Sequence, residues 1–155
     1  MKILVPHDGS AISDKAFKKA IEFAKELGYE IILLHIIDLE LLKADSITKY
    51  IHEKSELKKA NAQLLTYLKL GSESMLKDKI REAKKENVKV RFILGIGSTP
   101  EGIVNVANSE NVDFIVIGSR GLSSEGKNEQ DRLRILGSVA RHVSEIAVCP
   151  VMIIK

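Results

Sequence analysis

Five short aliphatic segments recur along the chain, and helical patterns separate them. The segments lie at 3–5, 31–37, 88–94, 114–117 and 151–154, and their apolar residues follow one another with little alternation. Such runs are typical of parallel strands, because helices cover both faces of a parallel sheet. We therefore predict five buried strands.

Cap signals mark two of the helices. The first apolar stripe runs from Ala16 to Leu27, and Gly28 follows it at the position where a left-handed cap is favoured. A further helix is predicted to begin with Thr99 as its N-cap and Pro100 in its first turn. These signals place one helix after the first strand and one after the third.

Two more helices complete the pattern. An apolar stripe after Gly137 predicts a last helix, which Pro150 ends. The stretch 47–87, rich in Lys, Glu, Leu and Ala, predicts a long helix that is broken near Gly71-Ser72 and carries its charges on a solvated face. Its expected inward positions are Leu57, Leu64, Leu65, Leu68, Met75, Leu76 and Ile80.

The alternation of strands and helices predicts a five-stranded, doubly wound α/β fold of the Rossmann-like kind, with helices on both faces of a parallel sheet. A chain of 155 residues corresponds to a single domain, 1–155. Ligands of such sheets bind beyond the carboxyl ends of the strands, where the strand order reverses. The loops that follow the strands are therefore the candidates for a functional site.

Composition and charge exclude several classes of protein. The chain has 45% hydrophobic and 29% charged residues, and its longest apolar run is far shorter than the roughly 18 residues of a membrane span. The 24 Lys and Arg residues against 21 Asp and Glu leave a net charge of +3, and aromatic residues make up 5% of the chain. We therefore expect neither a membrane nor a nucleic-acid partner.

The N-terminal segment and the cysteine content predict a cytoplasmic protein. Pro6 and the charge that follows interrupt this segment before a signal-peptide core could form. The lone Cys149 cannot form an intramolecular disulfide or a thiolate zinc site, which fits a reducing compartment. Its position before Pro150 at the start of a strand indicates a small core residue rather than a nucleophile.

The loop after the first strand carries one carboxylate. Asp8 lies at the carboxyl end of a buried strand and just before a helix. It can either cap that helix or face a ligand in the crevice. Ser10 and Ser13 could provide the cap instead, so position alone leaves both roles of the carboxylate open.

Glycines follow the fourth strand and precede the last helix. Gly118 and Gly121 are three positions apart, and the last helix begins after Gly137-Ser138. Glycine allows close approach of a phosphate or ribose, and the free N–H groups of a helix N-terminus attract anions, although ordinary turns use glycine as well. The chain has neither a G-x-G-x-x-G after its first strand nor a Walker A Gly-Lys-Ser/Thr, so those nucleotide-binding classes fit poorly.

Several segments together resemble the universal stress protein family. They are ILVPHDGS at 3–10, DFIVIGSRG at 113–121, and LGSVA at 136–140 with CPV at 149–151, and the similarity extends over nearly the whole chain. The resemblance implies the family's α/β fold, adenine-nucleotide binding, and a role as a regulator or switch in stress response. It also implies a homodimer that forms through the last strand, 151–154, because an exposed aliphatic edge requires a partner.

Nucleotide-binding members of that family carry G-x-x-G, then nine residues, then G-S or G-T. This motif maps to Gly118, Gly121, Gly137 and Ser138, but here fifteen residues, 122–136, separate its two halves, which is six more than nine. The longer loop supports an alternative interpretation, a nucleotide-free protein of the same fold whose loop and long charged helix bind another protein.

The implied ligand is ATP or AMP, with Mg²⁺ carried by the phosphates. The resemblance implies that Asp8 and the backbone near Ile36 hold the adenine end, that the glycines border the ribose and phosphates, and that the last helix receives phosphate oxygens. At His7 the family usually has a small or β-branched residue, and a histidine ring there could stack on the base or obstruct it. The residues implied around the nucleotide are Pro6, His7, Asp8, Ile36, Ile117, Gly118, Ser119, Gly121, Gly137, Ser138, Val139 and Ala140.

No motif for rapid catalysis is present. The four histidines lack metal-ligand spacing, Ser138 has no neighbouring base, and no G-x-S-x-G elbow occurs. Any hydrolysis of ATP would be slow and would depend on a divalent metal held by the phosphates. An adenylyl-transferring enzyme of a related fold is a third interpretation, but it requires signature histidine or lysine motifs that the sequence lacks.

Overall fold

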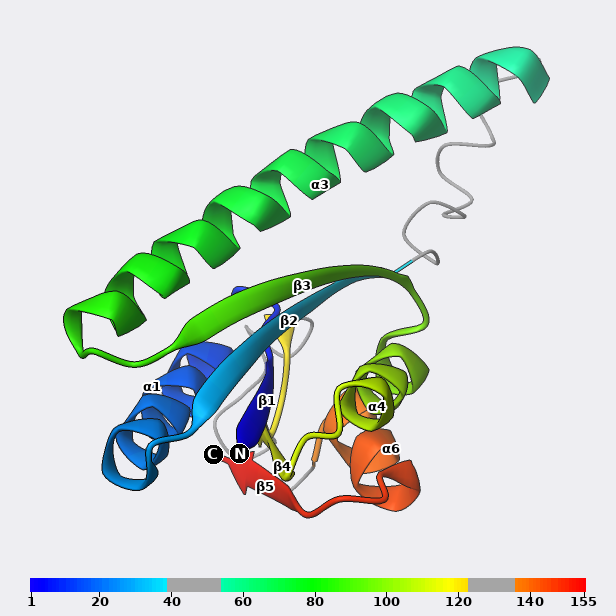
Figure 1. Cartoon of the computed structure of the whole chain (residues 1–155). Coiled ribbons are helices and arrows are strands. Elements are labelled where there is room, and N and C mark those ends of the chain that lie inside the picture. The colour runs from blue at the N-terminus through cyan, green and yellow to red at the C-terminus, as the bar shows by residue number, and fades with distance from the viewer. Residues whose placement is uncertain (39–53, 123–135) are drawn as a thin grey trace.

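The structure is a computed structural model that describes residues 1–38, 54–122 and 136–155. Within these ranges strands and helices alternate in the predicted order (Figure 1). The elements are β1 (Lys2–Pro6), α1 (Ala11–Leu27), β2 (Glu30–Asp38), α3 (Lys54–Lys85), β3 (Val90–Gly97), α4 (Thr99–Ser109), β4 (Phe114–Gly118), α6 (Ser138–Ile146) and β5 (Val151–Ile154).

The strands of the described ranges form one parallel sheet with the order β3-β2-β1-β4-β5. The chain moves outward from β1 to β3, then returns across β1 and continues outward through β4 and β5. The strand order therefore reverses between β1 and β4, where Ile3 lies opposite Phe114 and Leu4 lies opposite Ile115. The predicted doubly wound fold is confirmed, and the reversal places the loops after β1 and β4 next to each other.

Helices cover both faces of the sheet (Figure 1). On one face α1 and α3 pack on the strands, and Phe17 lies in a cluster with Ile3 and Leu33. On the other face α4 and α6 pack on the strands, and Ile103 and Val143 belong to the second cluster. These side chains are almost completely buried, and burial of one such side chain stabilises the fold by about 1.5–3 kcal/mol. The two clusters hold the strands, and with them the loops that leave the strand ends.

The helix caps agree with the sequence prediction at α1 and differ by one residue at α4. Ser10 caps α1, and Gly28 ends that helix in the left-handed conformation with a φ of 71°. α4 has Ser98 rather than Thr99 as its N-cap, because the Gly102 N–H already donates to the Ser98 carbonyl at 3.0 Å. The sequence signal therefore identified this helix but misplaced its first residue.

α3 is one continuous helix of 32 residues, so the predicted break near Gly71-Ser72 is wrong. A glycine in a helix costs about 1 kcal/mol relative to alanine, and strong helix formers on both sides outweigh that cost. Of the predicted inward positions, Leu76 is completely buried and the other six are half-buried, while the unpredicted Ala83 is also completely buried. The part of the prediction before Lys54 lies outside the described residues.

A few smaller features also bear on the sequence predictions. β3 begins two residues later than predicted and continues to Gly97, while Val88 is buried but precedes the strand. Cys149 is half-buried and packs against the cluster of α4 and α6, as expected of a core residue. Across the described ranges, no helix combines the length and the apolar character that crossing a membrane requires.

We predict that Gly71→Ala raises the free energy of unfolding by about 0.5–1 kcal/mol, because alanine restricts the unfolded chain and suits a helix interior. No atom lies within 4 Å of an added Cβ at this position. Gly28→Ala is the matched control and should lower stability by about 1 kcal/mol, because its φ of 71° disfavours a side chain. Urea unfolding of both variants checks this, and a loss of stability at Gly71 would mean that the helix is not continuous there.

Candidate functional site

A cavity of about 340 Å³ lies at the carboxyl ends of the strands, beside the point where the strand order reverses. The loop after β1, the loop after β4, the start of α6 and the end of β2 contribute to its wall. Its volume is within the usual range of small-molecule sites. Eleven of the twelve residues predicted from the sequence line it: Pro6, His7, Asp8, Ile36, Ile117, Gly118, Gly121, Gly137, Ser138, Val139 and Ala140.

The twelfth predicted residue, Ser119, is buried behind the cavity wall rather than lining it. Its N–H donates to the Ile154 carbonyl at 2.6 Å, and its carbonyl accepts the Gly137 N–H at 2.8 Å. Through these two bonds Ser119 ties the end of β5 and the start of α6 to the loop after β4. Its role in the structure is therefore to support the wall.

Asp8 joins the two loops at the reversal point. Its Oδ2 accepts the backbone N–H of Leu122 at 2.9 Å, and its Oδ1 accepts that of Ser10 at 3.0 Å. Burial opposes the charge, but hydrogen bonds from Ser10, Leu122 and Ser13 outweigh it and lower the pKa of Asp8 below 3.8. Asp8 is therefore an ionised acceptor at neutral pH. The N-cap of α1 is Ser10, so Asp8 does not have the capping role that the sequence left open for it.

The motif glycines are required by close backbone packing, not by left-handed torsion angles. A Cβ on Gly121 would lie 2.5 Å from Asp8 Oδ2, and a Cβ on Gly118 would lie 2.8 Å from Ile12 Cγ2. At Gly137 a Cβ would lie 3.2 Å from the Ser119 carbonyl oxygen. Each of these glycines lets one segment of the cavity wall approach another.

The N-terminus of α6 brings hydrogen-bond donors to the cavity. The first-turn residues Ser138, Val139 and Ala140 all line it, and their N–H groups have no acceptor within the helix. Within the described parts of the chain, no side chain caps this helix end. The helix dipole adds about half a positive charge at the same point, so this end of the cavity favours an anion.

The opposite wall is apolar and was only partly predicted. Ile36 lies over α4, where a Cβ on Gly102 would collide with its side chain, and Leu34 and Ile103 lie nearby along the wall. Such a surface suits the flat ring of a base. The lining residues that the sequence analysis missed are Ser13, Leu34, His35, Asp38, Thr99, Ile103, Arg120 and Leu122. Leu34, His35 and Asp38 lie in the carboxyl-terminal half of β2, and Thr99 and Ile103 lie in the helix after β3, so treating the end of every strand as a contributor would have found them.

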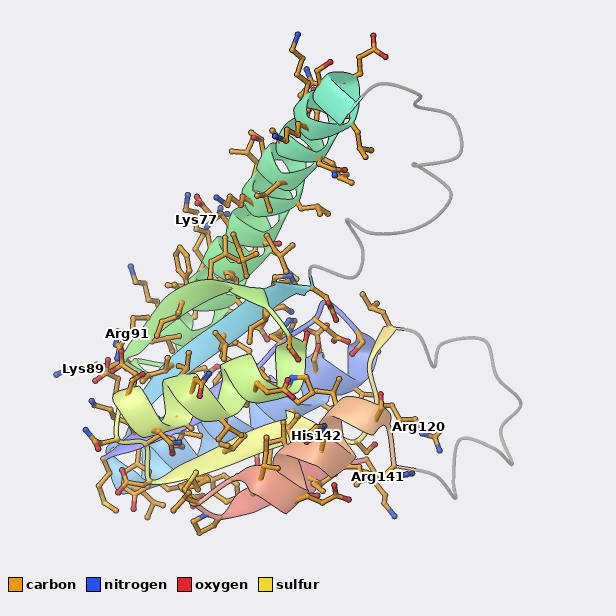
Figure 2. The ribbon with its side chains drawn as sticks, turned by 90° about the vertical axis from the view of Figure 1, so that its right-hand side faces the viewer. Lys77, Lys89, Arg91, Arg120, Arg141 and His142 are labelled. Carbon is orange, nitrogen blue, oxygen red and sulfur yellow. The ribbon has the colours of Figure 1, made fainter. Side chains whose placement is uncertain are left out.

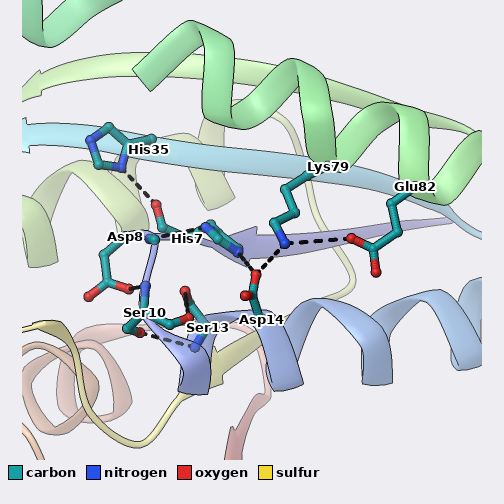
Figure 3. Close-up of polar contacts among 9 residues, drawn as sticks. His7, Asp8, Ser10, Ser13, Asp14, His35, Lys79 and Glu82 are labelled. Carbon is teal, nitrogen blue, oxygen red and sulfur yellow. Dashed lines mark hydrogen bonds and ion pairs between the residues drawn. The ribbon is translucent and has the colours of Figure 1, made fainter. Parts of the chain in front are cut away.

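His7 turns its side chain away from the cavity. The imidazole has no exposed surface, packs edge-on against Phe17 at 6.3 Å between ring centroids, and places Nε2 2.9 Å from Asp14 Oδ1 (Figure 3). The expectation that the ring would stack on a base or obstruct the site is therefore wrong. The buried space beneath α3 accepts the ring, and the main chain of His7 is what borders the cavity.

His7 is electrically neutral in this structure. The N–H of Gly9 donates to Nδ1 at 3.2 Å, so Nδ1 carries no proton and Nε2–H donates to Asp14. Burial lowers the pKa of His7 below 6.5 and the charge of Lys79 lowers it further, against the opposing effects of Asp14 and Asp8. The hydrogen-bond geometry and the direction of the pKa therefore agree.

The enlarged loop of the phosphate motif lies outside the described residues, apart from Leu122 and Leu136 at its ends. Within 1–38, 54–122 and 136–155, no group of three or more His, Cys, Asp or Glu side chains is placed to hold a metal ion. The described site consists of an acceptor, a set of amide donors and an apolar wall.

We predict that Gly121→Ala lowers the free energy of unfolding by about 1–3 kcal/mol, because the added methyl group displaces the Asp8 carboxylate and leaves it without the Leu122 N–H. Urea unfolding measures the loss, and the amide proton shift of Leu122 reports the broken bond. Gly71→Ala serves as the control for an alanine that meets no neighbour. Unchanged stability together with an unchanged Leu122 shift would contradict the proposed packing.

The neutral His7 predicts a dependence of stability on pH. Its pKa is lowered in the folded state, so between that pKa and 6.5 the unfolded chain binds more protons than the folded one. The resulting stability is complete above 6.5 and is lost as the pH falls through 6.5 toward the folded pKa. Melting curves from pH 7.5 to 5 should show a steeper loss for the natural chain than for His7→Asn, which cannot titrate; parallel curves would refute this.

Comparison with known proteins places the chain in a family. All residues, 1–155, match the model described as the universal stress protein family. Universal stress protein YxiE of Bacillus subtilis is 32% identical, over 99% of this chain and 98% of that protein. Universal stress protein MJ0577 of Methanocaldococcus jannaschii is 33% identical, over 99% of this chain and 94% of that protein.

Solved structures show the same fold. The structure of MJ0577 superposes with a TM-score of 0.81 at 28% identity and covers 99% of this chain and 94% of its own. A universal stress protein from Archaeoglobus fulgidus in complex with dAMP superposes at 0.65 with 22% identity, over 100% of this chain and 98% of its own. A further universal stress protein, in complex with cAMP, superposes with a TM-score of 0.62 at 19% identity and covers 99% of this chain and 94% of its own. This chain belongs to the universal stress protein family.

Proposed function

We propose that this chain binds an adenine nucleotide, AMP or ATP, and acts as a nucleotide-dependent regulator or switch in stress response. The observation that carries the proposal is the meeting of Asp8 with the uncapped start of α6 around one cavity. An acceptor, an anion-attracting helix end and an apolar wall together suit a molecule with hydroxyl groups, a phosphate and a flat base.

The phosphate would lie at the start of α6. The N–H groups of Ser138, Val139 and Ala140 are donors without helical acceptors, and the Ser138 hydroxyl can add another. Two cationic side chains lie toward the same end of the molecule: Arg120 lines the cavity, and Arg141 follows on α6 (Figure 2). Their charges add to the attraction of an anion to this end.

The nucleoside would lie between Asp8 and the apolar wall. Each carboxylate oxygen of Asp8 already accepts one N–H, but a carboxylate offers about four lone-pair sites, so it retains capacity for a ligand donor. Ile36 lines the wall where a base would rest. The dAMP and cAMP complexes of two proteins with this fold make adenine nucleotides the first class to test.

Chemistry at the site would be limited to binding and, at most, slow hydrolysis. Mg²⁺ would enter with ATP and be held by the phosphates, as the family resemblance implies. The cavity-facing side chains give no nucleophile with a paired base among the residues that the structure describes. We therefore propose a binding role, and the N-terminal segment and the lone cysteine support a cytoplasmic location.

We also propose a homodimer that forms through β5. This strand pairs with β4 on one side and lies at the edge of the sheet, and its Met152 is 38% exposed. Val148, just before the strand, is 86% exposed, so an apolar surface continues beyond the strand. Pairing of two β5 edges would cover it.

Titration calorimetry with AMP, Mg-ATP and adenosine tests the proposed function. We predict that Ser138→Pro weakens AMP binding at least tenfold, because it removes one amide donor and one hydroxyl from the phosphate end. The preceding Gly137 has φ −62° and ψ 154°, which a following proline accepts, and proline is tolerated at the first helical position. Ser138→Ala, which removes the hydroxyl alone, should weaken binding about fivefold or less.

Adenosine is the internal control, because it lacks the phosphate and its affinity should not change in either variant. Folded protein that gives no heat with AMP or Mg-ATP at millimolar concentration would reject nucleotide binding. That outcome would favour the nucleotide-free interaction protein, for which the fifteen-residue segment 122–136 is the supporting feature.

A further inference from the structure

Lys79 lies on the packed face of α3 and reaches Asp14 in the first turn of α1, just after the loop that carries Asp8. It is one turn from Leu76 and from Ala83, which are both completely buried, and its own side chain is 20% exposed. Its Nζ lies 2.5 Å from Asp14 Oδ1 and 3.5 Å from a Glu82 carboxylate oxygen (Figure 3). A lysine in such a position is uncommon and needs a paired charge. Burial lowers the pKa of Lys79, but Asp14 and Glu82 raise it more, so it stays charged.

Asp14 contacts His7 as well as Lys79. The same Oδ1 that pairs with Lys79 accepts the Nε2–H of His7, and Nδ1 of His7 accepts the Gly9 N–H. The ring thus bridges α1 and the peptide that follows Asp8. Only a neutral imidazole can do this, because a protonated Nδ1 would face the Gly9 N–H as a second donor.

A second contact joins α3 to the loop between β1 and α1. Met75, one helical turn before Lys79, places its sulfur 3.2 Å from the point where a Cβ of Gly9 would lie. Gly9 has a φ of 89°, a backbone conformation that residues with a side chain rarely adopt. α3 therefore meets this part of the chain at two points, through an apolar contact with Gly9 in the loop and an ionic contact with Asp14 in α1.

The main chain of His7 fixes the other side of this loop. Its N–H donates to the Leu34 carbonyl at 2.8 Å, and its carbonyl accepts Nδ1–H of His35 at 2.7 Å. Leu34 and His35 both line the cavity. A change in how α3 packs here would therefore shift the peptide at His7 and Asp8, and with it the wall of the cavity.

α3 itself extends well beyond these contacts. From Met75 back to Lys54 the helix continues for about 30 Å at 1.5 Å per residue, and in Figure 1 this part runs out past the sheet. Tyr67 and Leu70 on it are 73% and 61% exposed. The carboxyl-terminal part of the helix therefore packs against the cavity loop and α1, and its amino-terminal part extends beyond the sheet.

We propose that His7 is a positioning residue of the nucleotide site. In this proposal, the path from Lys79 through Asp14 to His7 couples the packing of α3 against the cavity loop and α1 to nucleotide affinity. The proposal rests on the proposed function. Coupling of this kind is reciprocal, so a nucleotide in the cavity tightens the contact of α3 with the loop, and loss of that contact weakens the nucleotide. Lys79 acts by keeping His7 neutral and by holding the Asp14 carboxylate in place.

Lys79→Met is the central test variant. Methionine keeps the helix propensity and the apolar stem of lysine but removes its charge, so the chain is expected to fold with a somewhat lower melting temperature, because Asp14 loses one partner of a half-buried ion pair. AMP affinity measured by calorimetry should fall about fivefold. A purely structural lysine would lower the melting temperature but leave the affinity of the folded protein unchanged. Lys77→Met, which removes an exposed ion pair with Glu73 on the other side of the helix, is the matched control and should leave affinity unchanged.

A double-mutant cycle tests whether His7 and Lys79 act along one path. His7→Asn keeps an acceptor for the Gly9 N–H but cannot reach Asp14, and it should weaken AMP about fivefold as well. The double variant should be no weaker than either single one, because both substitutions interrupt the same path. A multiplied loss of about 25-fold would mean independent effects and would overturn the coupling.

Hydrogen exchange of the α3 amides at 72–83, with and without AMP, provides the reciprocal readout. AMP should slow exchange there in the natural chain and in Lys77→Met, and should have no such effect in Lys79→Met. If the natural chain binds AMP and Lys79→Met binds it equally well, the coupling is refuted while the proposed function stands. If the folded natural chain does not bind AMP, both are refuted.

Discussion

The hydrogen bond from the Leu122 N–H to the Asp8 carboxylate is the contact on which the described site depends. It joins the loop after β1 to the loop after β4, at the point where the strand order reverses. The two loops can approach this closely because Gly121 has no side chain, since a Cβ there would lie 2.5 Å from the carboxylate. The parallel register of β1 and β4 brings the loops together, and the glycine lets them touch. Without either one, the cavity would lack one wall.

Local sequence patterns were enough to predict most of the fold. Buried aliphatic runs identified the strands, and Gly28 and Pro150 marked real boundaries, because these signals act within a few residues. The break at Gly71 was predicted wrongly, because the cost of one glycine is small against a helix that packs along the sheet. The rule that ligands bind beyond the carboxyl ends of parallel strands also predicted where the cavity lies.

What the sequence could not show were contacts between distant residues. Lys79 is 72 positions from His7, and no local pattern links an imidazole after β1 to an ammonium group on α3. For this reason His7 was assigned to the cavity, although its ring lies beneath α3. Ser119 was likewise expected at the ligand, whereas its backbone is used to hold α6 and β5. Motif position predicts where a residue lies, but its orientation follows from packing.

The cavity has two chemically different ends, and the central claim is that they bind two different parts of one adenine nucleotide. The most direct measurement compares the amide shifts of the ¹⁵N-labelled protein on addition of AMP and of adenosine. AMP should move the amide signals of Ser138, Val139 and Ala140, and both compounds should move those of Asp8 and Ile36. Shifts at Ser138–Ala140 that are equally large with adenosine, or AMP shifts confined to residues away from the cavity, would contradict the account.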